Sequence, residues 1–298
     1  MSDIKITDEL LIEELKLRFE EKKNSLKKLE KLTTELKEVN HKLAESEALK
    51  SHFISNITNE IVNPFTSIVI LSKNILSIKE GNWEKVMKMA NLIFTEAFNL
   101  DFQLKNIFAA AEIEAGELFL EVSNITIDSL IDAVIESFIT EAKKKNLIFE
   151  FLKAGDETND IRFKTDSEKL RLILSNLVEN AVKYSKNDKI IIKRDIDEGV
   201  LTISVQDFGI GISENNKKII FDRFKRIDTG INSINRGHGL GLSINKALLD
   251  FLSGEIKIDS IKNVGSTFTI NIPEAVPDAE SFSADGSDYL FDTDDEIF

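Results

Sequence analysis

The sequence has no cysteine among its 298 residues and only three prolines. The missing cysteines exclude disulfide bonds, a thiol nucleophile and a cysteine-held iron–sulfur cluster, and they fit a reducing compartment. No run of about eighteen apolar residues occurs, and the N-terminus continues from Met-Ser-Asp into charged helix formers, which excludes a signal peptide. We therefore expect a cytoplasmic protein without membrane insertion.

Basic residues are outnumbered, because 38 Lys and Arg stand against 52 Asp and Glu, which gives a net charge of −14. Nine of the acids lie in residues 273–298, which hold no Lys or Arg, so the rest of the chain carries a net −5. An acidic surface argues against nucleic-acid binding. The composition of residues 273–298 predicts a disordered tail, which is either a solubilising end or an acidic and aromatic segment that docks on a partner or on its own domain.

Glycine and proline are absent from residues 8–50, where the apolar residues follow a 3-4 spacing. This pattern predicts a coiled-coil signalling helix over residues 1–50, with a lone amphipathic helix as the alternative. The residues of the expected seam are Leu29, Leu32, Leu36, Val39 and Leu43.

The apolar periodicity continues over residues 51–116 and is broken near Glu80-Gly81-Asn82. This predicts a helical hairpin. Two helices cannot bury a continuous apolar seam alone, so pairing with a second copy into a four-helix bundle is the natural solution. We therefore expect a homodimer that is formed through this dimerisation hairpin.

After Gly116 the sequence alternates between short β-rich runs and helical patterns. We expect helices at 128–145 and 240–252, and a further helix that contains Asn176 and opens with a capping box at Thr165-Asp-Ser-Glu168. We expect strands at 147–152, 189–196, 201–205, 255–260 and 267–272, with Asp197-Glu-Gly199 joining an antiparallel hairpin. The predicted fold class is α+β, in which the helical part is followed by an α/β sandwich over residues 117–272 and regular structure stops at Pro273.

Polar residues at helical spacing provide the first chemical signal. Asn176 and Asn180 are four residues apart on one helix face, and Lys183 follows one turn later. Two neutral oxygen ligands and one ammonium suit a magnesium-bound polyphosphate. Two asparagines on a solvated face are the alternative.

Two glycine-rich segments provide the second signal. Asp207 follows an apolar strand and precedes Gly209 and Gly211, so its carboxylate would lie at a strand end where a flat ligand can approach. A turn shaped only by backbone needs is the alternative there. The second segment holds Gly237, Gly239 and Gly241 and leads into an apolar helix whose first amides would hold phosphate oxygens. Residues 225–235 between the two segments are polar, as expected for a lid.

In this order and spacing the motifs resemble the N, G1, F and G2 boxes of sensor histidine kinases, which share the gyrase, Hsp90 and MutL type of ATP-binding fold. The boxes are Asn176–Lys183, Asp207–Gly211, Phe221–Phe224 and Gly237–Leu242. The resemblance covers residues 45–272. It implies that Asp207 holds adenine, that Asn180 and Asn176 bind Mg²⁺, that Lys183 contacts phosphate and that the G2 glycines surround the triphosphate of ATP. The remaining residues of the implied ATP site are Tyr184, Gly209, Gly211, Phe224, His238, Leu240 and Leu242.

Asn176 occupies the position where the hydrolytic relatives of this fold have a glutamate that activates water. Glu179 cannot replace that glutamate, because it is adjacent to Asn180 and lies about 100° around the helix. Without a general base at the γ-phosphate, we expect ATP to wait for an external nucleophile.

The resemblance also covers the family's phosphoacceptor motif, with one departure. The motif places a histidine before Glu-x-x-[Thr/Asn]-Pro, and this chain has Asn59-Glu60-Ile-Val-Asn63-Pro64. An amide nitrogen is not nucleophilic, so Asn59 is not expected to be phosphorylated. Three explanations stay open: Asn59 was introduced in place of histidine, it marks a natural pseudokinase, or another nucleophile serves.

The chain has few candidates for another nucleophile near this motif. They are His52, Ser55 and Thr58, and His52 is expected to be a solvated or interface residue. In the family Glu60 resembles the acid that orients the acceptor, and Asn63 resembles the amide that positions water against a phosphorylated response regulator. A helix-kink role beside Pro64 is the alternative for Asn63. The partner implied is the receiver domain of a response regulator, and the alternative function is a pseudokinase scaffold or the inactive half of a heterodimer.

Overall fold

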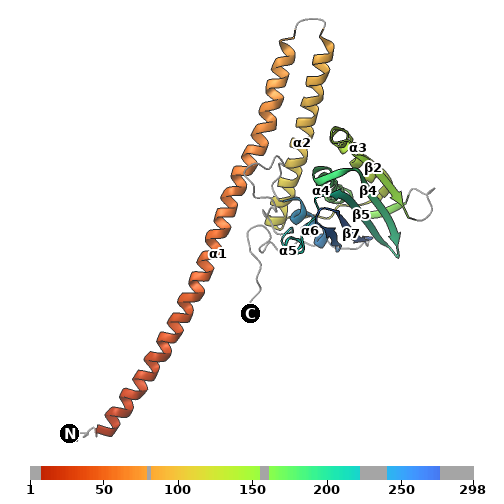
Figure 1. Cartoon of the computed structure of the whole chain (residues 1–298). Helices are drawn as coiled ribbons and strands as arrows, with labels where there is room; N and C mark the ends of the chain where they lie inside the picture. The colour runs from red at the N-terminus through yellow and green to blue at the C-terminus, as the bar shows by residue number, and fades with distance from the viewer. Residues whose placement is uncertain (1–7, 79–81, 155–160, 222–239, 276–298) are drawn as a thin grey trace. The chain divides into compact units, whose positions relative to one another are not determined.

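The computed structural model describes residues 8–78, 82–154, 161–221 and 240–275 (Figure 1). The chain divides into two units, and the described part of the first, residues 8–52, is entirely helical. The second unit begins at Phe53 and contains every other described element. Within the described ranges, no helix is both long and apolar enough to cross a membrane.

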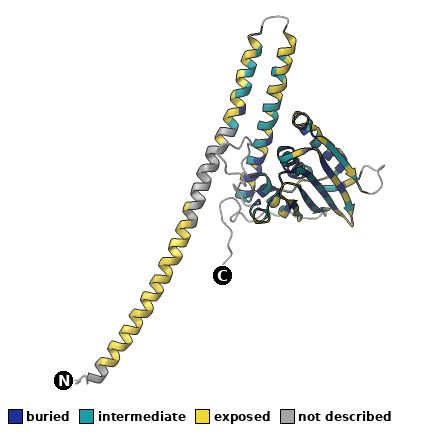
Figure 2. Ribbon diagram, viewed as in Figure 1, coloured by how far each residue is buried: buried dark blue, intermediate teal, exposed yellow. Residues whose placement is uncertain are grey.

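The helical part consists of α1 (Asp8–Leu76) and α2 (Trp83–Ala115). The gap between them contains Glu80-Gly81-Asn82, so the predicted position of the break is confirmed. The Asn82 side chain caps α2 by accepting a hydrogen bond from the Lys85 amide, and Gly116 ends this helix with a left-handed φ of 66°. Many apolar side chains of both helices are exposed, including Leu29, Leu36 and Phe94, as the yellow colour along α1 shows (Figure 2).

The second half of the chain contains a five-stranded sheet with the order β2-β4-β5-β7-β6. Its strands are β2 (Ile148–Lys153), β4 (Ser185–Asp197), β5 (Val200–Gly209), β6 (Glu255–Ile261) and β7 (Gly265–Pro273). β2 pairs with β4 in parallel, and all other neighbours are antiparallel. The predicted hairpin is confirmed, because Asp197 pairs with Val200 around Glu198 and Gly199, which both have positive φ.

Three helices pack on one face of this sheet, so the α/β sandwich is confirmed (Figure 1). They are α3 (Ile127–Lys144), α4 (Ser167–Tyr184) and α6 (Gly241–Phe251). Alternate residues of β5 are buried from Leu201 through Asp207 to Gly209, and this face meets the apolar side of α4. Asp207 therefore lies on the core face of the sheet, at the end of its strand.

Two short strands, β1 (Val122–Thr126) and β3 (Arg162–Asp166), form an antiparallel sheet that the sequence patterns did not predict. The short helix α5 (Glu214–Lys217) was also not predicted. The predicted capping box was wrong, because the residue that caps α4 is Asp166 and not Thr165. The N-cap of α4 is Asp166, whose carboxylate accepts hydrogen bonds from the amides of Glu168 and Lys169.

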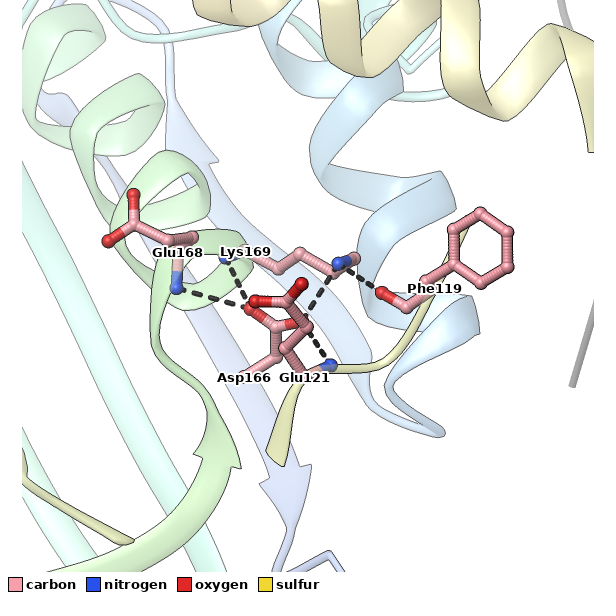
Figure 3. Close-up of polar contacts among 5 residues, drawn as sticks. All are labelled: Phe119, Glu121, Asp166, Glu168 and Lys169. Carbon is pink, nitrogen blue, oxygen red and sulfur yellow. Dashed lines mark hydrogen bonds and ion pairs between the residues drawn. The ribbon is translucent and has the colours of Figure 1, made fainter. Parts of the chain in front are cut away.

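Asp166 also ties the segment after α2 to the start of α4 (Figure 3). Its Oδ2 accepts from the Glu121 amide (3.0 Å) and from Lys169 Nζ (2.8 Å). Lys169 Nζ donates in turn to the carbonyl oxygen of Phe119. One carboxylate therefore orders both the first turn of α4 and the polypeptide that enters the sandwich.

A second charged cluster lies between α3 and β4. Arg194 is fully buried, and its guanidinium donates two hydrogen bonds to Asp128, at 2.9 and 2.8 Å. Lys153 Nζ lies 2.9 Å from the same carboxylate, and this hydrogen bond is the largest cause of the raised pKa of Lys153. Because Asp128 stands in the first turn of α3, the cluster fixes this helix to the sheet.

Candidate functional site

Asp207 is 6% exposed and keeps its carboxylate in a network of hydrogen bonds. Its Oδ1 accepts from the Gly209 amide (2.8 Å), and both the backbone and the side chain of Ser266 on β7 bond to the same carboxylate. Burial raises the pKa of Asp207, and the bonds from Gly209 and Ser266 oppose that rise. The strand end thus holds one desolvated acceptor in a fixed orientation.

The glycines around Asp207 are required by the packing of this chain against itself. A Cβ at Gly209 would lie 2.0 Å from the carbonyl oxygen of Tyr184, and one at Gly211, where φ is 57°, would lie 2.0 Å from that of Ile261. Gly265 has a φ of 145°, and its Cβ would lie 2.1 Å from the Asp207 carbonyl oxygen. A larger residue at any of these positions would move backbone. The contact of Gly209 and Gly211 with a ligand stays a prediction.

The C-terminal half of α4 carries Asn180, Lys183 and Tyr184, which are all half-buried. Lys183 Nζ lies 5.3 Å from the centre of the Tyr184 ring. Lys145 Nζ donates to the carbonyl oxygens of Val182 (2.9 Å) and Lys183 (2.8 Å), so it satisfies the last turn of the helix. This end of α4 reaches the end of β5, because the Ile210 amide donates to the Tyr184 carbonyl (3.4 Å).

Asn176 differs from the half-buried Asn180, Lys183 and Tyr184 of the same helix, because it is only 1% exposed. Its Nδ2 donates to Asn245 Oδ1 on α6 (2.8 Å) and, more weakly, to the Gly241 carbonyl (3.4 Å). Asn245 Nδ2 donates to the Ile173 carbonyl on α4 (3.0 Å). The Asn176 amide thus faces another helix inside the sandwich, and its role as a metal ligand stays a prediction.

The N-terminus of α6 begins at Gly241, after the buried Leu240. The first intrahelical bond runs from the Ile244 amide to the Leu240 carbonyl (2.9 Å), so the amides of residues 241–243 precede it. Among the described residues no side chain caps this helix. A helix start without a side-chain cap favours an anion, because the amides and the helix dipole both attract negative charge. Leu242, also in the predicted set, is half-buried there.

Several predicted site residues lie outside the described part of the chain. Phe224, Gly237, His238 and Gly239 fall in residues 222–239. Asn59 and Glu60 lie in α1 without described side chains, whereas Asn63 is exposed and Pro64 is buried in the same helix. The described residues contain no group of three His, Cys, Asp or Glu side chains that could hold a metal ion.

Three of the four motifs therefore meet at α4. The end of β5 contacts Tyr184, and the start of α6 contacts Asn176, since a Cβ at Gly241 would lie 3.2 Å from Asn176 Oδ1. A buried carboxylate, a half-buried asparagine and lysine, and a helix start that no described side chain caps are polar groups that suit a nucleotide with its magnesium ion.

Comparison with known proteins agrees with this arrangement. Residues 165–276 match the family of histidine kinase-, DNA gyrase B-, and HSP90-like ATPases. The sensor protein RprX of Bacteroides fragilis is 31% identical over 230 residues, which are 76% of this chain and 44% of that protein. The sensor protein GacS of Pseudomonas syringae pv. syringae is 30% identical over 264 residues, which are 83% of this chain and 28% of that protein.

The chain belongs to the histidine kinase family. Full-length ShkA, solved in complex with AMPPNP, shares the fold with a TM-score of 0.54 at 20% identity, over 80% of this chain and 47% of that one. This histidine kinase chain spans less than half the length of these two sensor proteins.

The sequence patterns did not predict three residues of this histidine kinase site. Ser266 bonds to Asp207, and the only local signal was its place after Gly265 at the start of a strand. No sequence pattern pointed to Asn245 or Lys145, because single polar residues are common within a helix and directly after one. Their partners are at least 37 positions away in the sequence.

Proposed function

We propose that this histidine kinase chain binds magnesium ATP and acts in a two-component phosphorelay, as an autokinase, as a response-regulator phosphatase, or as both. The convergence of β5 and α6 on α4 supports this proposal most directly. It brings a buried acceptor to the C-terminal end of α4 and the start of α6 beside Asn176, and among the described residues no side chain caps that start. An acceptor for adenine and free amides for phosphate are the groups that a nucleoside triphosphate needs.

The described residues suggest a role for each part of the nucleotide. Asp207 would accept a hydrogen bond from the exocyclic amine of adenine, since its carboxylate is held by Gly209 and Ser266. The amides at the start of α6 and the ammonium of Lys183 would hold phosphate oxygens. Asn180 would supply a neutral oxygen to Mg²⁺, which neutralises charge between the phosphates.

The phosphoryl group would leave ATP for a nucleophile outside the nucleotide site. Asn59 cannot accept it, so autophosphorylation of this chain would need another acceptor. Asn63 is exposed on α1, where its amide can meet a receiver domain. A phosphatase that positions water against an aspartyl phosphate needs this amide and no histidine. A pseudokinase scaffold, or the inactive half of a heterodimer, is the second candidate, and Asn59 is the observation that favours it.

A homodimer is part of the same proposal. Apolar side chains are exposed along α1 at the predicted seam and on both helices of the hairpin. They include Leu29, Leu32, Leu36, Val39, Val62, Phe65, Val69, Phe94 and Phe108. Exposed apolar surface of this extent calls for a partner, and a second copy offers the same apolar surface.

The test is phosphoryl transfer from γ-labelled ATP. We expect the chain itself to stay unlabelled and an Asn59→His variant to become labelled. Label on the unchanged chain would instead reveal another acceptor, which alanine at His52, Ser55 or Thr58 would locate. An Asn59→His/Asp207→Asn double variant is the control, because it restores the acceptor and removes the adenine contact. Labelling of that control to the same level would contradict the assigned site.

A further inference from the structure

Asn245 is 0% exposed, and both ends of its amide are engaged by α4. Its Oδ1 accepts from Asn176 Nδ2 (2.8 Å), and its Nδ2 donates to the Ile173 carbonyl (3.0 Å). Burying an amide is unfavourable unless it is hydrogen-bonded, so both bonds are required by the position. Their direction fixes how α6 can lie against α4.

The pair acts on the functional end of α6. Asn245 stands one turn after Gly241, the first residue of the helix, and Asn176 also approaches the Gly241 carbonyl (3.4 Å). Apolar contacts alone would let the two helices slide along each other, whereas these directed bonds define one register. The first turn of α6 is therefore held beside the part of α4 that precedes Asn180 by one turn.

We propose that Asn176 and Asn245 form a positioning pair that keeps the phosphate-binding start of α6 in register with Asn180, and that Asn176 is not a magnesium ligand. The proposal rests on the proposed function. A ligand must present its oxygen to a hydrated ion, whereas Asn176 is 1% exposed and directs its amide toward α6. Asn180, which is half-buried, remains as the ligand from this helix.

The test measures the affinity of the full chain for ATP, ADP and adenosine by calorimetry, with magnesium or with EDTA. We expect Asn245→Ala and Asn176→Ala each to weaken ATP binding by roughly tenfold. The loss should be the same in magnesium and in EDTA, and adenosine affinity should change by less than about twofold. The double variant should lose little more than either single variant, because both changes remove one interaction.

Two results would overturn the proposal: a loss at Asn176→Ala that appears only with magnesium, or losses that add in the double variant. Asn271→Ala is the matched control, because it also removes two hydrogen bonds of a side-chain amide, those to Thr202 (2.9 Å) and Glu255 (2.7 Å). Asn271 lies on β7, five positions after Ser266. The substitution should leave ATP affinity unchanged.

Amide hydrogen exchange without nucleotide separates this proposal from the proposed function. Exchange at residues 244–248, whose amides are the first with intrahelical hydrogen bonds, should be faster in Asn245→Ala and unchanged in Asn271→Ala. If the wild-type chain bound no ATP, the proposed function would fail, yet this exchange result would still decide whether the pair holds α6. Unchanged exchange at these residues would overturn the pair.

Discussion

The carboxylate of Asp166 supports the start of α4 and the entry into the sandwich at the same time (Figure 3), and an Asp166→Asn substitution separates these two tasks. The asparagine oxygen can still accept from the amides of Glu168 and Lys169, so the helix cap survives. The new NH₂ group faces two donors, the Glu121 amide and Lys169 Nζ. Both lose their acceptor.

The magnitude follows from burial. The Asp166 side chain is 2% exposed and that of Lys169 is 16% exposed, so the pair is nearly desolvated. Removing one partner of such a pair costs about 3–5 kcal/mol, and the partial exposure of Lys169 favours the lower value. At about 2–4 °C per kcal/mol for a domain of this size, the unfolding temperature should fall by roughly 6–12 °C.

Differential scanning calorimetry of the full chain measures this shift. An Asp166→Asn/Lys169→Met double variant should unfold at a higher temperature than Asp166→Asn alone, because it no longer leaves an unpaired charge. Lys257→Met is the matched control, since the Lys257–Glu255 pair is largely exposed and solvent screens its charges, so its loss should change stability little. An Asp166→Asn shift no larger than that of the control would refute this reasoning.

Four further predictions concern the sandwich. Because burial raises the pKa of Asp207, ATP affinity should decline on acidification at a higher pH than for an ordinary aspartate. Calorimetry at successively lower pH should show no such decline in Asp207→Asn. The same raised pKa means that the nucleotide-free protein loses stability as the pH rises and Asp207 ionises, which urea unfolding of wild type against Asp207→Asn would detect. Gly265→Ala should lower the free energy of unfolding by about 3 kcal/mol and weaken ATP binding, because its Cβ would lie 2.1 Å from the Asp207 carbonyl. Arg194→Met should lower the free energy of unfolding by about 3–5 kcal/mol in urea, because Asp128 would stay buried without its main partner.

Local patterns were sufficient to predict most of the sandwich. Asp197, Glu198 and Gly199 predicted their hairpin because they separate two β-rich runs and a tight turn with positive φ favours glycine, and the alternation in residues 201–205 predicted β5. The paired strands β1 and β3 were missed because they meet across about forty residues and neither has a regular alternation. No local pattern encodes a pairing of that separation.

The candidate site was also predicted only where its residues form a local pattern. Asp207 and the asparagines of α4 stood out because their spacing carries chemistry within one segment. The sequence could not show that Asn176 faces inward while Asn180 is half-buried, because both share the same helix spacing. The sequence pattern predicted Thr165 as the cap of α4, whereas the carboxylate of Asp166 accepts the hydrogen bonds from the first turn of the helix.

Calorimetric titration of the full chain with magnesium ATP tests the central assignment most directly. We expect saturable binding at one site per chain, and a loss of at least about tenfold in affinity for Asp207→Asn with the unfolding temperature retained. Equal affinity in the two proteins, or no saturable heat in the wild type, would contradict the assignment of the nucleotide site to α4, β5 and α6.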